Sequence, residues 1–100
     1  MTAQPDARLA VLVHALRQTA AFVERAGVPG LAVYVSHDSV SIQVPASAGC
    51  LDDRIAAVTR LARAAGAAAG PSASGSFAGT DTQIAGHPAH IFTPLPLQAP

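Results

Sequence analysis

Histidine is the residue type in this chain that could take part in the widest range of chemistry. Two of the four histidines, His87 and His90, lie three positions apart, and His37 stands next to Asp38. Imidazole and carboxylate groups at short spacing are typical zinc ligands. Residues three apart in a strand point to opposite faces, so His87 and His90 converge only if a turn lies between them. We therefore predict no metal site, and we assign no role to His14 in the polar sector of the first expected helix.

The single cysteine, Cys50, directly precedes a stretch expected to be helical, a place where a thiol can be activated as a nucleophile. Asp52 and Asp53 oppose this because their charges favour the neutral thiol, and no histidine lies near in sequence to act as a base. The two carboxylates diverge by about 100° on a helix and cannot share a substrate. The glycines between 66 and 70 lack the Lys and Ser/Thr of a phosphate-binding loop. We predict neither a catalytic residue nor a cofactor.

Charge and composition narrow the function classes further. Six arginines balance six acidic residues, so the formal net charge is zero and nucleic acid is disfavoured as a partner. The first apolar run is broken by His14 and Arg17 and follows no basic leader, so we expect no signal peptide and no membrane span. One cysteine cannot form an internal disulfide, which favours a cytoplasmic protein. The absence of Lys and Asn and the 23 alanines are typical of a GC-rich, actinobacterial type of genome.

Strict alternation of apolar and polar residues from Leu31 to Val44 predicts a half-buried β-hairpin. We place its connection at His37 and Asp38. The facing pairs on the buried side are then Val35 with Val40, Val33 with Ile42, and Leu31 with Val44.

Two helices are expected to cover this hairpin. The first begins near Pro5 and Asp6 and ends near Ala26, because Gly27 suits a left-handed C-terminal conformation. The second runs from about 51 to 65, has Asp52 and Asp53 in its first turn, and ends at Gly66. The core stripe that we predict for the first helix consists of Leu9, Leu12, Val13, Leu16, Ala20 and Val23.

The remainder of the chain is expected to complete one small domain of residues 1–100. Residues 66–76 form a flexible Ala/Gly/Ser linker, and residues 96–100 form a C-terminal tail. Residues 77–84 and 89–95 form a second hairpin around Gly86 and His87, whose register we do not assign. Pro88 and Pro94 confine this hairpin to a sheet edge or to strand ends.

These elements predict an α+β two-layer sandwich of αββαββ order. We expect a four-stranded antiparallel sheet with both helices on one face, an order that resembles a ferredoxin-like sandwich circularly permuted by one strand. The opposite sheet face stays open. The polar and aromatic residues that we expect on it are Tyr34, Ser36, Ser41 and Gln43, with His90 and Phe92.

The function that we predict lies in surfaces. Val11, Ala15 and Phe22 form a second apolar patch on the first helix, wider than a two-layer fold requires. We expect a non-enzymatic cytoplasmic interaction module that is homodimeric and serves another macromolecule as an accessory or regulatory partner. The interaction residues are Tyr34, Ser41, Gln43, Phe92, Val11 and Phe22.

Two alternatives remain open. The first is a binder of a small molecule or of nucleic acid on the open sheet face, whose aromatic side chains resemble the platform of single-strand RNA binders. Its weakness is that the expected strands carry no Lys or Arg. The second is a small metal- or thiol-dependent enzyme that uses His87, His90 or Cys50.

Overall fold

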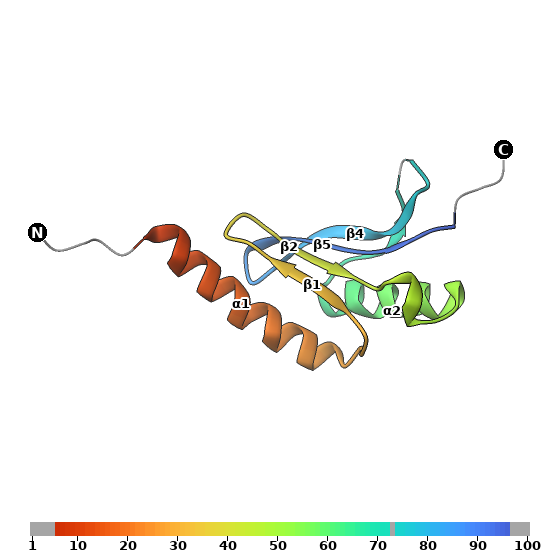
Figure 1. Cartoon of the computed structure of the whole chain (residues 1–100), viewed down its shortest axis with the longest axis horizontal. Helices are drawn as coiled ribbons and strands as arrows, with labels where there is room; N and C mark the ends of the chain where they lie inside the picture. The colour runs from red at the N-terminus through yellow and green to blue at the C-terminus, as the bar shows by residue number, and fades with distance from the viewer. Residues whose placement is uncertain (1–5, 73, 97–100) are drawn as a thin grey trace, which may run out of the picture.

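The structure, a computed structural model, describes residues 6–72 and 74–96. Two helices pack on one face of a mixed five-stranded open sheet, with strand order β1-β2-β5-β4-β3 (Figure 1). The predicted two-layer α+β architecture is confirmed. Residues 97–100 of the expected tail lie outside the described residues. The elements are α1 (Ala7–Ala26), β1 (Ala32–Val35), β2 (Val40–Gln43), the short 3-10 helix η1 (Ala46–Ala48), α2 (Leu51–Ala64), β3 (Gly70–Pro71), β4 (Phe77–Ile84) and β5 (His87–Pro94).

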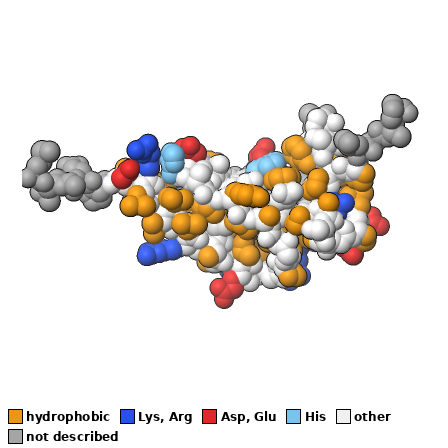
Figure 2. Space-filling view, in the orientation of Figure 1, with side chains coloured by type: hydrophobic (Ala, Val, Ile, Leu, Met, Phe, Trp, Pro, Cys, Tyr) orange, Lys and Arg blue, Asp and Glu red, His pale blue; other side chains and the backbone are white. Residues whose placement is uncertain are grey.

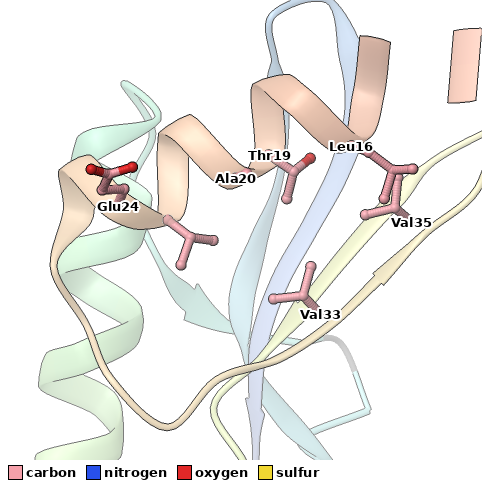
Figure 3. Close-up of a pocket in the computed structure, with 7 residues that line it drawn as sticks. Leu16, Thr19, Ala20, Glu24, Val33 and Val35 are labelled. Carbon is pink, nitrogen blue, oxygen red and sulfur yellow. The ribbon is translucent and has the colours of Figure 1, made fainter. Parts of the chain in front are cut away.

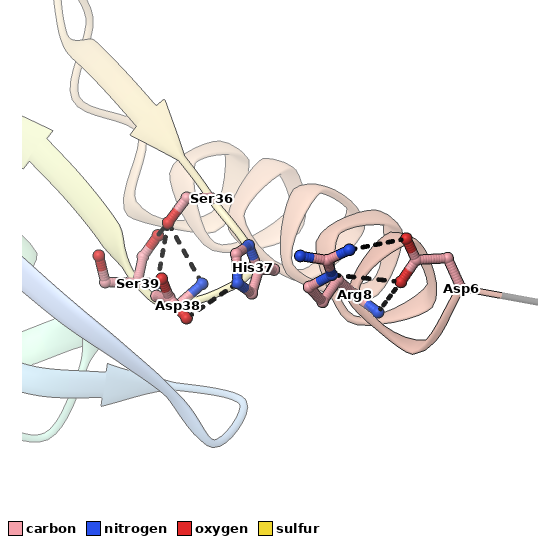
Figure 4. A network of polar contacts seen from close by, with 6 residues as sticks. All are labelled: Asp6, Arg8, Ser36, His37, Asp38 and Ser39. Atoms are coloured by element: carbon pink, nitrogen blue, oxygen red, sulfur yellow. Dashed lines mark hydrogen bonds and ion pairs between the residues drawn. The ribbon is translucent and has the colours of Figure 1, made fainter.

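Both ends of α1 are set by local signals in the sequence. Asp6 is the N-cap, and its carboxylate accepts a hydrogen bond of 2.9 Å from the backbone N–H of Arg8 (Figure 4). Gly27 closes the helix in the left-handed region at φ 65°, and its N–H donates to the carbonyl of Val23 at 3.1 Å. The predicted end near Ala26 is confirmed.

The β1–β2 hairpin has the predicted register. Val35 pairs with Val40 and Val33 with Ile42 in antiparallel fashion. Val33, which was predicted to be buried, is 39% exposed because β1 is an edge strand. In the turn, the Ser36 hydroxyl accepts hydrogen bonds from the backbone N–H groups of Asp38 and Ser39, each at 3.2 Å (Figure 4). The His37 ring lies 3.1 Å from the Asp38 carboxylate. These contacts span at most three positions, so they shape the turn and bring in no distant residue.

The core lies between the inner sheet face and the two helices. Strand β2 contributes Val40, Ile42 and Val44, and β5 contributes Ala89 and Ile91. Helix α2 adds Val58 and Leu61. The side chain of Ile42 is fully buried, as its place in the alternating pattern predicts.

The buried stripe of α1 differs from the predicted one. Leu9 and Leu16 are 58% and 48% exposed, and Ala20 is also exposed. The side chains that face the core are Ala15, Thr19, Phe22 and Ala26. Because consecutive residues differ by about 100° around a helix, the true stripe is displaced by roughly a quarter turn from the predicted one. Phe22 is 2% exposed, so the prediction that it lies on the surface is wrong.

The predicted four-stranded antiparallel sheet is wrong in two respects. A fifth strand, β3, pairs antiparallel with β4, and the central strands β2 and β5 run parallel, with Val40 opposite Ala89. Both differences have one origin. Gly70 and Pro71, within the segment predicted as a linker, already form β3, and the chain reverses once more before β4. This additional reversal inverts the direction of the second hairpin relative to the first.

The second hairpin exists as predicted, but its turn lies one residue earlier. Ala85 and Gly86 connect β4 to β5 with φ values of 49° and 85°, the left-handed pair that a tight two-residue hairpin turn requires. Strand β5 lies inside the sheet, between β2 and β4, and not at an edge. Pro88 and Pro94 nevertheless lie near its two ends, where the missing N–H groups do least harm to the ladder.

Arg54 is buried within α2, which the sequence pattern did not predict. Its Nη1 donates to the hydroxyl of Thr93 at 2.9 Å and to the carbonyl of Pro94 at 2.7 Å. Its Nε donates to the carbonyl of Gly49 at 3.2 Å, and the Thr93 hydroxyl donates in turn to the carbonyl of Val44 at 2.7 Å. The guanidinium thus joins α2 to β5 and to the preceding loop, a structural role that accounts for its burial.

Candidate interaction surfaces

An apolar groove runs between α1 and the edge strand β1. It encloses about 540 Å³. Leu16 and Ala20 line it from the helix, and Val33 and Val35 line it from the strand (Figure 3). Val23 and Thr19 complete the helical wall, and Glu24 stands at one end. The groove is therefore lined by part of the stripe that the sequence predicts as core.

This groove continues into a helix surface on which none of the described residues packs. The N-terminal half of α1 projects past the end of the sheet (Figure 1). Leu9 and Val11 there are 58% and 40% exposed, and Leu12 and Val13 are half-buried. Hydrophobic side chains gather along α1 in the space-filling view (Figure 2). A helix with apolar residues on this much of its circumference is normally covered by another element.

Thr19 is a buried polar residue on the inner wall of the groove. Its hydroxyl is buried and has no hydrogen-bond partner among the described residues. A buried hydroxyl without a partner forfeits its hydration without compensation. Its neighbours along the groove wall, Leu16, Ala20 and Val23, are apolar.

We expect Thr19→Val to stabilise the protein by about 1 kcal/mol, because a methyl group of similar size replaces the unpaired hydroxyl. The free energy of unfolding from urea denaturation measures this change. Thr59→Val is the matched control, since the Thr59 hydroxyl donates to the carbonyl of Ile55 at 2.9 Å. A destabilised Thr19→Val protein would show that the hydroxyl has a partner in solution.

The open sheet face carries an aromatic cluster at its centre. His90 and Phe92 stack with ring centroids 4.5 Å apart. Phe77 meets both rings edge-on, at 5.1 Å from His90 and 5.8 Å from Phe92. A shallow hollow of about 270 Å³ adjoins Phe77, His90 and Gly79. Tyr34 is 65% exposed on the same face but belongs to none of these ring contacts within the described residues.

Polar residues surround this aromatic cluster. Ser41 pairs with Tyr34 and His90 in adjacent strands, and Gln43 pairs with Phe92. Both Ser41 and Gln43 are half-buried. Asp81 is largely exposed, and its carboxylate lies 2.6 Å from Nδ1 of His90. The five strands contain no arginine.

His14, His87 and His90 pair differently from the arrangement predicted from spacing, whereas His37 contacts its neighbour Asp38. His87 and His90 lie on opposite faces of β5, with no turn between them. His90 contacts Asp81, whereas Nε2 of His87 lies 2.6 Å from Nδ1 of His14 on α1. Sequence reasoning assigned no role to His14, because its partner is 73 positions away.

The remaining candidate chemical groups stay apart. Cys50 is exposed at the N-cap of α2, and Asp52 and Asp53 occupy the first turn of that helix. Within residues 6–72 and 74–96, no three residues of the types His, Cys, Asp and Glu come together as a metal site. No helix in this described part of the chain combines the length and apolar character needed to cross a membrane.

Comparison with protein-family models, with curated proteins and with solved structures finds no match to this chain.

Proposed function

We propose that this protein is a non-enzymatic interaction module that forms a homodimer through the groove between α1 and β1. The observation that supports the proposal is the apolar stripe of α1, which leaves Leu9 and Leu16 about half exposed in a single copy. Full burial of a leucine contributes about 1.5–3 kcal/mol relative to exposure, so several such residues provide the driving force for association.

A second copy is the partner that best fits the groove. In a two-fold dimer the same surface meets itself, so a projecting apolar helix on one subunit must meet an apolar depression on the other. The N-terminal half of α1 is such a projection, and the groove beside Val33 is such a depression. An antiparallel arrangement of two α1 helices places each projection in the groove of the other subunit.

Charge supports the antiparallel arrangement. Glu24, at the end of the groove, is the only acidic residue within α1. Arg8 lies at the other end of the helix, so antiparallel helices bring Arg8 of one copy toward Glu24 of the other. Opposite charges at the rim of an interface chiefly select orientation and register.

The test is a charge placed in the groove. Leu16→Glu should convert a dimer into a monomer and raise the dimer dissociation constant at least about a hundredfold, because the carboxylate would have to be buried against apolar side chains. Light scattering coupled to size-exclusion chromatography over a range of concentrations measures the mass. The Leu16→Glu monomer should still unfold cooperatively, since Leu16 is about half exposed in one copy, but its melting temperature should lose the contribution of the dimer.

Ala21→Glu is the matched control, because it places the same charge on an exposed position of α1 about 140° from Leu16. This variant should remain dimeric. A wild-type monomer at every concentration would refute the homodimer, and equal dissociation of both variants would refute the groove as its interface.

In the same proposal the module acts in the cytoplasm and serves another macromolecule. The lone cysteine, Cys50, favours a reducing compartment. Dimerisation through α1 and the edge of β1 leaves the outer sheet face free, so Tyr34 and the nearby aromatic cluster would meet the second partner. Exposed aromatic side chains are enriched at protein interfaces.

The aromatic cluster also supports a second candidate function, the binding of a small planar molecule beside Phe77 and His90. The adjoining hollow and the stacked rings favour it. Ultraviolet absorption of a copurified compound, lost in Phe77→Ala but retained in Leu16→Glu, would favour this function over a purely protein-binding role.

A further inference from the structure

His14 and His87, which lie far apart in the sequence, meet in the folded chain. Nδ1 of His14 lies 2.6 Å from Nε2 of His87, and the ring centroids are 4.9 Å apart. One ring comes from α1 and the other from the first residue of β5. Without a metal ion, the N–H of one ring donates a hydrogen bond to the bare nitrogen of the other, and an ion that binds both rings would replace that proton.

We propose that His14 and His87 form a two-imidazole site for a divalent transition-metal ion of the class Cu²⁺, Ni²⁺ and Zn²⁺. Imidazole nitrogen is a preferred ligand of these ions. Metal–nitrogen bonds of about 2.0–2.1 Å place two ligating nitrogens about 2.9 Å apart at a 90° angle and about 3.3–3.4 Å apart at the tetrahedral angle of zinc, so the rings need to separate by about 0.3–0.8 Å. His14 is exposed and His87 half-exposed, which permits this movement and lets water complete the coordination.

The composition of the site sets its selectivity. Within the described residues no third ligand of the types His, Cys, Asp or Glu joins the pair, so the site lacks a carboxylate. Mg²⁺ and Ca²⁺ require oxygen ligands and should therefore not bind. Metal binding should not depend on dimerisation, because His14 lies about 160° around α1 from Leu16 and its groove.

A bound ion would tie α1 to the β4–β5 turn. Because the ion binds the folded chain, in which the two rings are close, it should raise the melting temperature, and above the dissociation constant this rise should follow the logarithm of the metal concentration. Only neutral imidazole ligates a metal, so this stabilisation should weaken on acidification.

Two double variants make a matched test, because each retains two of the four histidines. Untagged protein is titrated with NiCl₂ or ZnCl₂ by calorimetry, and melting is followed in parallel. Wild type and His37→Ala/His90→Ala should bind one ion per chain. His14→Ala/His87→Ala should bind at least about tenfold more weakly, because the second bond is no longer intramolecular. MgCl₂ should shift no melting curve.

Equal affinity of the two double variants would overturn the site, since separate surface histidines would then collect the ions. Absence of wild-type binding at millimolar metal would also overturn it and leave a proton as the bridge. Circular dichroism verifies folding of each variant. If the alanine variant unfolds, His14→Gln/His87→Gln supplies the same test with polar side chains of similar size.

Discussion

Replacing Ile42 with aspartate is expected to abolish the cooperative unfolding transition. Ile42 is fully buried on β2 and belongs to the same core cluster as Leu61 and Ile91. The substitution removes about 1.5–3 kcal/mol of apolar burial and places a carboxylate where it finds no water. Domains of this size have a total stability of about 5–15 kcal/mol, so the combined loss exceeds what such a fold can tolerate.

Circular dichroism and thermal melting measure this effect. Ser41→Asp is the matched control, because Ser41 precedes Ile42 on the same strand and points to the open face. The control should retain a cooperative transition near that of the wild type. A cooperative melt of Ile42→Asp within a few degrees of wild type would mean that the inner and outer faces of the sheet are interchanged.

Gly79→Ala is expected to destabilise the protein by about 3 kcal/mol, an unusually large effect for one added methyl group. A Cβ atom at Gly79 would overlap the backbone carbonyl oxygen of Ile91 and approach Cα and Cβ of Phe92 to 2.8 Å. The obstacle is backbone of the neighbouring strand, not the end of a flexible side chain. The β4–β5 ladder would therefore have to shift, and with it the stacked rings of Phe92 and His90.

Gly70→Ala is the control for this prediction. Gly70 pairs with Gly79 across the β3–β4 ladder, yet a Cβ there meets no atom within 4 Å. Its substitution should change stability by less than about 0.5 kcal/mol. Urea denaturation measures the free energy of unfolding of both variants. Similar values would show that β4 and β5 are farther apart at Gly79 than in this structure.

Much of the local structure follows from the sequence because short-range effects determine it. The alternation from Leu31 to Val44 specifies both strands and their register, since a shift by one residue would move every apolar side chain to the wrong face. Asp6 and Gly27 mark the limits of α1 through capping, which depends on neighbours within one turn. The same reasoning correctly places Tyr34 on the outer sheet face.

Which side of α1 is buried, in contrast, depends on how the helix packs in the tertiary structure. The helix carries two apolar stripes with the same period, and the stripe of Leu9 and Leu16 has the larger side chains. The structure buries the stripe of Ala15 and Phe22 instead. Small residues let the helix approach α2 and β4 closely while Phe22 fills the core, so complementarity of shape outweighs the summed hydrophobicity of the stripe.

The direction of β5 and the contact between His14 and His87 also depend on tertiary structure. The short strand β3 reverses the chain once more and makes β2 and β5 parallel, although Gly70 and Pro71 carry the composition of a linker. This arrangement places His87 beside α1, 73 positions from His14. Periodicity and capping act over a few residues, so the sequence alone determines the elements and their local faces. Which faces meet is determined only when the elements pack together.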